Sequence, residues 1–318
     1  MLLDALLSRR LWIISGKGGV GKTTLAAALG LVASRNGKRV LVAEVEGKHA
    51  LSALFDEESL THTPIRLDQN LYGMSISPDK SLEEYFSDQL HLGRIAKPIV
   101  SSQVLDWVAH AAPGLRDILM LGKVWHEANR KQDYDLIVLD TAAAGHAVSM
   151  LRSPQGFLHA VPVGPLANQA RRIVEWLQDP EEVCILLASL AEEMPVNETI
   201  ETTQLLEERV GMDVAAVLIN MLYSPISESA SITAQVEGFR GPADLISETP
   251  MSQQAARDLY ECSRFYVELR ALQQEHRAKL VKTESHTAAM VDIPYLFTAK
   301  LGRSELDILA AEIEEQMT

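Results

Sequence analysis

The stretch that decides the fold is residues 11–23, which read Leu-Trp-Ile-Ile-Ser-Gly-Lys-Gly-Gly-Val-Gly-Lys-Thr. An apolar run of strand length leads into a glycine-rich turn, and residues 23–34 then follow a helical pattern rich in Ala and Leu. The turn fits GxxxxGK(S/T) over residues 16–23, in the strand–turn–helix setting that this motif requires. Glycines let successive backbone N–H groups point at phosphate oxygens, and the helix adds its positive end. The sequence therefore predicts a phosphate-binding loop.

The motif gives each loop position a role. Lys22 is expected to reach the β and γ phosphates of a nucleoside triphosphate, and the hydroxyl of Thr23 to hold Mg²⁺. The other positions contribute mainly backbone N–H groups. The loop residues expected to bind the nucleotide are Gly16, Lys17, Gly18, Gly19, Val20, Gly21, Lys22, Thr23 and Thr24.

Short apolar runs alternate with longer helical patterns along most of the chain. Strands that are apolar throughout must be covered on both faces, which favours parallel pairing between layers of helices. The pattern predicts an α/β, doubly wound fold with a mostly parallel sheet of about seven strands. The expected strands are residues 11–14, 40–45, 71–76, 136–139, 183–187, 214–219 and 293–297.

Two segments, at about 78–132 and 224–288, carry helix signals and no strand signal. Ser81 and Glu84 have capping-box spacing in the first segment. The second contains a long helix with one apolar stripe, formed by Ala255, Leu259, Cys262, Tyr266, Leu269 and Leu272. We expect one domain over residues 1–318, in which both segments form an inserted helical subdomain over one edge of the sheet.

Composition excludes several classes of function. The 318 residues contain 29 Lys and Arg against 43 Asp and Glu, a formal net charge of −14, so bulk charge will not hold the chain to nucleic acid or to an anionic membrane. The two cysteines, Cys184 and Cys262, exclude a disulfide framework and the common CxxC metal patterns. No run approaches the ~20 apolar residues of a membrane span. We expect a cytoplasmic protein that meets membranes only peripherally or through a partner.

Lys17 directly follows the first glycine of the loop, where a lysine is not needed to hold phosphate within one subunit. In this position the chain resembles the deviant Walker A family of P-loop ATPases, the SIMIBI class. That family includes nitrogenase iron protein, the MinD and ParA ATPases, the arsenite-pump ATPase ArsA and the Get targeting ATPase. The resemblance implies a dimer that closes on ATP, in which Lys17 reaches across the interface to the partner's nucleotide.

Asp140 ends the apolar run 136–139 and is followed by Thr-Ala-Ala-Ala and then by Gly145 and His146. This stretch is similar to switch II of the ArsA and Get ATPases, and the chain is most similar to the bacterial single-domain members of that group. The resemblance implies that Asp140 contacts Mg²⁺ through water. Gly145 would be a hinge, and His146 would belong to the switch.

Residues 44–49, Glu-Val-Glu-Gly-Lys-His, stand where the first switch of these ATPases begins. The resemblance places their water-positioning aspartate at Glu46 and their histidine at His49. A glutamate keeps the carboxylate that orients a water molecule. Glu44 lies two residues away on the same strand face and stays an alternative, as does a purely structural role for both glutamates.

The resemblance implies Mg²⁺-dependent hydrolysis of ATP, with Lys17, Lys22, Glu46 and Asp140 as the catalytic residues. Asn220, which ends the run 214–219, would contact the adenine edge and favour ATP over GTP. The partner would be a second copy or a paralogous ATPase, and nucleic acid is not expected.

The helical subdomain would bind a hydrophobic protein client, although its apolar residues could equally form its own core. The candidate positions are Tyr85, Phe86, Leu90, Ile95, Ile99, Val104, Trp107, Leu115, Leu119 and Trp125. Two other functions stay open: a positioning ATPase like ParA or MinD, and the ATPase subunit of an arsenite-type anion pump. The first would need a basic or membrane-anchoring surface, and the second would need metalloid-binding cysteines beyond the two present.

Overall fold

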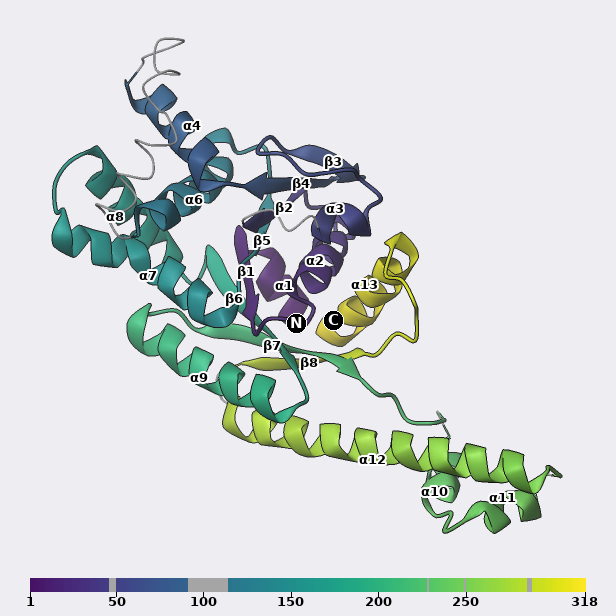
Figure 1. Cartoon of the computed structure of the whole chain (residues 1–318). Coiled ribbons are helices and arrows are strands. Elements are labelled where there is room, and N and C mark those ends of the chain that lie inside the picture. Colours follow the sequence, from purple (N-terminus) through teal and green to yellow (C-terminus); the bar gives the residue numbers. More distant parts are fainter. Residues whose placement is uncertain (46–49, 91–113, 228, 249, 285–287) are drawn as a thin grey trace.

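The computed structural model describes residues 1–45, 50–90, 114–227, 229–248, 250–284 and 288–318. In this part of the chain eight strands form one sheet in the order β3-β4-β2-β5-β1-β6-β7-β8 (Figure 1). Every neighbouring pair is parallel except β3 and β4. The strands are β1 (Leu11–Gly16), β2 (Val40–Val45), β3 (Ile65–Asp68), β4 (Leu71–Ile76), β5 (Leu136–Asp140), β6 (Val183–Leu190), β7 (Val214–Leu222) and β8 (Ala289–Pro294).

The strand predictions are confirmed except at the two edges of the sheet. The antiparallel edge strand β3 was not predicted, because its four residues, Ile-Arg-Leu-Asp, include two charged ones and none is fully buried. At the other edge the predicted strand 293–297 is displaced. The ladder pairs Ala216 with Ala289 and runs only to Pro294, and beyond it Phe297 is exposed.

Helices cover both faces of the sheet, which confirms the doubly wound α/β fold (Figure 1). One face packs on α1, α2, α3 and α13, and the other on α6, α7, α8, α9 and the end of α12. The helices are α1 (Leu2–Leu7), α2 (Lys22–Arg35), α3 (Ala50–Leu54), α4 (Pro78–Leu90), α6 (Leu115–His126), α7 (Ala144–Ala160), α8 (Pro165–Leu177), α9 (Glu193–Arg209), α10 (Ala230–Glu237), α11 (Pro242–Glu248), α12 (Gln253–Glu284) and α13 (Arg303–Met317), with a π-helical turn at Glu127–Lys131. No described helix combines the length and the apolar character needed to cross a membrane.

The two helical segments lie at different places on the sheet. Helix α4 packs on α6, which also contacts α7 and α8. Helix α12 packs on α9 and β7 and also contacts α10 and α11. Figure 1 shows α12 extending beyond the edge of the sheet formed by β7 and β8. Residues 91–113, which complete the first segment, lie outside the described residues. The single helical subdomain therefore stays a prediction.

One local prediction in these segments was wrong. Ser81 lies inside α4, where its hydroxyl donates to the carbonyl of Ser77 (2.8 Å), so it does not cap the helix with Glu84. The long helix is confirmed, and two residues of its apolar stripe, Leu259 and Leu272, are about half exposed. Its fully buried residues are Ala256 and Leu280.

Candidate nucleotide site

Close backbone packing explains two of the loop glycines. Gly16 ends β1 with φ of 145°, and a Cβ there would lie 2.1 Å from the carbonyl oxygen of Ala188. Gly21 has φ of 90°, and a Cβ there would lie 2.4 Å from the side-chain nitrogen of Asn220. Only glycine fits both the space and the left-handed backbone. The loop is therefore pressed against β6 and β7, in the path that the phosphate-binding motif predicts.

Lys22 begins α2 and folds back over the loop. Its Nζ donates to the carbonyls of Gly16 (3.0 Å) and Lys17 (2.8 Å). These two contacts hold the ammonium at the mouth of the loop. A cation held beside the start of a helix is the arrangement that binds phosphate.

Thr23 and Asp140 meet at the carboxyl end of the sheet. The hydroxyl of Thr23 donates to Oδ2 of Asp140 (2.6 Å), and Asp140 is 7% exposed. Thr141 fixes this end of β5, since its hydroxyl donates to the carbonyl of Ile14 on β1 (2.8 Å). Hydroxyl and carboxylate oxygens are the ligands that Mg²⁺ takes in proteins, so the two residues fit the predicted metal role.

A cavity of about 330 Å³ lies over these groups. It is large enough for part of a nucleotide. The phosphate loop, the start of α2, the ends of β2 and β5 and the segment before α7 all contribute to it. The lining residues are Gly18, Gly19, Gly21, Lys22, Thr23, Thr24, Glu44, Val45, Asp140, Thr141, Ala142 and Ala143.

Lys17 stands apart from this cavity. It is not among the described lining residues, and its Nζ forms an ion pair with Glu198 of α9 (3.3 Å). Both side chains are about one-third exposed. The loop therefore places its two lysines differently, with Lys22 over the phosphate cavity and Lys17 at the outer rim.

Asn220 holds the loop to β7. Its Nδ2 donates to the carbonyl of Val20 (2.9 Å), and its Oδ1 accepts the backbone N–H of Met221 (3.0 Å). The side chain is 5% exposed. These contacts place Asn220 beside the phosphate loop, and its contact with adenine stays a prediction.

The structure describes only some of the predicted switch residues. Glu46 and His49 lie outside the described residues. Gly145 and His146 are exposed in the first turn of α7, where the backbone N–H of His146 donates to the carbonyl of Ala143 (2.9 Å). No atom lies within 4 Å of where a Cβ on Gly145 would stand, so packing does not require this glycine. The hinge role stays a prediction.

Among the described client-surface candidates, Leu115 and Leu119 are buried, and Tyr85 and Trp125 are half-buried. Leu115 and Leu119 are buried with Leu82 in a small cluster, against which Tyr85 packs. Trp125 packs on the main core, with the Arg172 guanidinium 5.9 Å from its ring centre. Side chains of the remaining candidates lie outside the described set, namely Phe86, Leu90, Ile95, Ile99, Val104 and Trp107.

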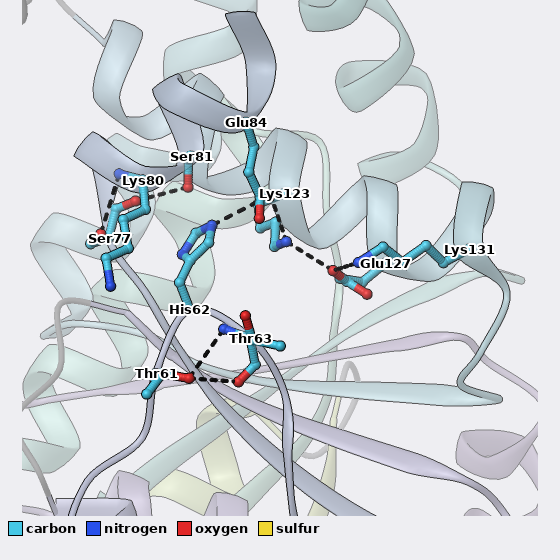
Figure 2. A network of polar contacts seen from close by, with 10 residues as sticks. All are labelled: Thr61, His62, Thr63, Ser77, Lys80, Ser81, Glu84, Lys123, Glu127 and Lys131. Carbon is cyan, nitrogen blue, oxygen red and sulfur yellow. Dashed lines mark hydrogen bonds and ion pairs between the residues drawn. The ribbon is translucent and has the colours of Figure 1, made fainter. Parts of the chain in front are cut away.

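A buried ionic network was not predicted from the sequence (Figure 2). The Nζ of Lys123, a side chain only 4% exposed, contacts Glu84 of α4 (2.6 Å) and Glu127 (2.9 Å). Glu127 also pairs with Lys131 (2.8 Å), and Nε2 of His62 lies 3.5 Å from Glu84. Spacing of four residues between Lys123, Glu127 and Lys131 was a signal for part of the network. Its other partners are distant in sequence.

The network sets the pKa of Glu84. Partial burial alone would raise that pKa, but the contacts with His62 and Lys123 outweigh it and lower the pKa to about 2. Glu84 is therefore charged at neutral pH and ties α4 to α6.

Comparison with known proteins gives one consistent family. Residues 9–161 match the family model described as anion-transporting ATPase. The ATPase BagA of Mycobacterium tuberculosis is 28% identical over 239 residues, which cover 72% of this chain and 70% of that protein. A putative arsenical pump-driving ATPase 2 of Aquifex aeolicus is 32% identical over 148 residues, 45% of this chain and 49% of that protein. The ATPase ASNA1 homolog 1 of Paramecium tetraurelia is 30% identical over 153 residues, 45% of this chain and 43% of that protein.

The matched range contains β1, the phosphate loop, α2, β2, β5 and α7, and so every element that carries Lys22, Thr23 and Asp140. Sequence similarity and site geometry thus agree on the same end of the sheet. Residues 9–161 are therefore similar to the ArsA/Get-type P-loop ATPases, and the family model and the relatives named as ATPases support ATP hydrolysis as the activity.

Proposed function

We propose that this ATPase works as a dimer that closes on Mg²⁺-ATP and reopens after hydrolysis. Each subunit would bind one nucleotide in the cavity over its phosphate loop and supply Lys17 to the nucleotide of its partner. The observation that carries the proposal is the separation of the two loop lysines. Lys22 lines the cavity, while Lys17 stands at the rim, where a second subunit could approach.

Within one subunit these residues would have different roles. Lys22 and the loop N–H groups bind the phosphates, and Thr23 with Asp140 would hold Mg²⁺, which neutralises phosphate charge when it is bound. Glu46 would orient the attacking water. These assignments rest on the placement of the described residues and on the motif at position 46.

Glu198 gives Lys17 a partner within the same subunit before closure. An ion pair between partly exposed side chains contributes only about 0–1 kcal/mol, so a triphosphate across the interface can replace it. Closure would therefore exchange a weak bond to Glu198 for a stronger bond to phosphate oxygens. The cost of releasing Lys17 is small.

The helical segments would transmit closure to a hydrophobic protein client. Support comes from α12, which carries exposed apolar side chains at Leu259 (47%), Phe265 (64%) and Leu272 (50%). Such side chains on a projecting helix suit an apolar partner. This part of the proposal names a class of partner and no single protein.

Light scattering with ADP and with a non-hydrolysable ATP analogue tests the dimer. We expect a monomer with ADP and a twofold mass with the analogue. Lys17→Ala should stay monomeric with the analogue and hydrolyse ATP about 10²-fold more slowly, because a transition-state cation is lost. Lys282→Ala, at an exposed lysine of α12, is the matched control and should behave like the parent. Parental turnover by Lys17→Ala would contradict the proposal.

An anion-pump subunit is the second candidate, because the matching family model describes anion-transporting ATPases and the Aquifex aeolicus relative is named for an arsenical pump. The cysteines do not favour it. Cys184 is buried, which raises its pKa to about 12, whereas Cys262 is exposed on α12. Stimulation of ATP hydrolysis by arsenite or antimonite would support this second function.

A further inference from the structure

Glu44 is a charged residue of the nucleotide cavity that the phosphate-loop motif does not explain. It lies near the end of β2, is 3% exposed, and lines the cavity together with Lys22, Thr23 and Asp140. A carboxylate that lines the cavity beside Lys22 and Thr23 can act on the nucleotide or on the ion that binds there.

Strand geometry sets Glu44 beside Asp140. On β2 and β5, Val42 and Val138 face the α2 side of the sheet, so Glu44 and Asp140, two residues further on, face that side as well. The two acids are direct register partners on adjacent parallel strands. Neighbouring strands lie about 4.8 Å apart, so the two carboxylates extend from neighbouring points over the start of α2.

Two neighbouring carboxylates under a triphosphate would repel both each other and the phosphates. A divalent cation between protein and phosphates converts that repulsion into attraction. Mg²⁺ suits the position because it usually keeps several water ligands and is bound through one or two carboxylates together with substrate phosphates. Asp140, hydrogen-bonded to Thr23, supplies one such carboxylate.

We propose that Glu44 is the second carboxylate of the Mg²⁺ site and acts as a positioning residue on the water ligands of the ion. This inference deepens the proposed function, since it rests on Mg²⁺-ATP as the substrate. It also separates the two glutamates of the first switch: Glu44 serves the metal, and Glu46 serves the attacking water.

Nucleotide affinity measured against Mg²⁺ concentration tests the assignment without using turnover. A fluorescent ATP analogue is titrated by anisotropy in EDTA and then at increasing Mg²⁺. Glu44→Gln should raise the Mg²⁺ concentration at half effect by about tenfold or more, the usual consequence of losing an outer metal contact. Its affinity in EDTA should be unchanged or tighter, because one negative charge near the phosphates is gone. An unchanged Mg²⁺ midpoint overturns the proposal.

Two comparison variants sharpen the result. Asp140→Asn should shift the Mg²⁺ midpoint in the same direction, whereas Glu46→Gln should leave it unchanged and slow hydrolysis. The reverse pattern, a normal midpoint but slow hydrolysis in Glu44→Gln, would transfer the water-orienting role to Glu44 and refute the metal role. If Glu44→Gln does not fold, as judged by thermal melting, Glu44→Ser removes the carboxylate without adding volume and is measured instead.

The titration is repeated in the Lys17→Ala background, which prevents the proposed closure and leaves both carboxylates in place. A midpoint shift that persists there supports the role of Glu44 even if the dimer proposal fails. A shift that disappears there assigns the effect to closure and overturns the proposal for Glu44.

Discussion

The phosphate cavity and the Lys123 network both concentrate charge, but their lysines contact different groups. In the network the ammonium of Lys123 lies between two carboxylates, at 2.6 and 2.9 Å (Figure 2). In the phosphate cavity the ammonium of Lys22 donates to two neutral backbone carbonyls. One lysine is balanced by acidic side chains of the protein, and the other is positioned where phosphate can bind.

The difference separates a structural role from a functional one. Opposite charges in direct contact favour a single arrangement of α4 and α6, and removing one partner leaves the other uncompensated. Groups that converge on a cavity instead gain their strongest interactions when a ligand arrives. We therefore expect substitutions in the network to change the free energy of unfolding, and substitutions in the cavity to change binding or rate.

Lys123→Met should have the largest effect on stability. It removes the buried one of the two lysines that contact the almost fully buried Glu127, and breaking a buried pair in this way costs about 3–5 kcal/mol of unfolding free energy. Urea denaturation measures the loss. The double variant Lys123→Met with Glu127→Leu should recover much of it, because no buried charge is then left alone. A single variant as stable as the parent would show that the network is not structural.

Glu46→Gln should change the rate of ATP hydrolysis and not the stability of the protein. If Glu46 orients the water in the transition state, its loss raises the barrier to hydrolysis by about 2–4 kcal/mol and leaves ATP affinity and stability close to the parental values. Single-turnover hydrolysis measures the rate, with the exposed Glu58→Gln as the matched control. Equal rates for Glu46→Gln and parent would assign the role elsewhere.

The smallest expected effect is on the pH dependence of stability. The pKa of Glu84 is about 2 in the folded protein, below the ordinary value of 4.5, so its stabilisation is fully present above pH 4.5 and is lost as the pH falls toward 2. Because Glu84 is about half exposed, solvent screening reduces the contribution to about 1 kcal/mol. Urea denaturation of the parent and of Glu84→Gln should converge as the pH falls through this window. A constant difference would mean that Glu84 does not titrate there.

The phosphate loop could be predicted from sequence because its information is local. The strand, the glycines at 16 and 21 and the lysine at 22 all lie within residues 11–22, so the motif is complete in one short stretch. The neighbours that exclude a side chain at the two glycines, Ala188 and Asn220, become visible only in the fold. The central parallel strands were equally clear, because burial on both faces makes them largely apolar. Edge strand β3 gave no such signal, because its side chains are only partly buried.

Other features depend on contacts between distant parts of the chain. Nothing near Glu84 in the sequence indicates that its partner is Lys123 or that His62 lies beside both. The apolar stripe of α12 did not indicate that Leu259 and Leu272 are about half exposed, because this helix projects beyond the edge of the sheet. Glu44 was considered only as an alternative to Glu46, and the strand register that sets it beside Asp140 becomes visible only in the sheet.

The two hydrogen bonds of Asn220 have a consequence for the choice of base. One side-chain N–H is used on Val20, and one lone pair of the side-chain oxygen is used by Met221, which also fixes which way the amide faces. One donor and one acceptor are left over. Adenine offers a matching acceptor and donor at N7 and its amino group, whereas guanine offers two acceptors on that edge. If a purine meets this amide through that edge, the amino group of adenine can donate to Oδ1 of Asn220. In guanine the O6 atom takes the place of that amino group and would be repelled by Oδ1.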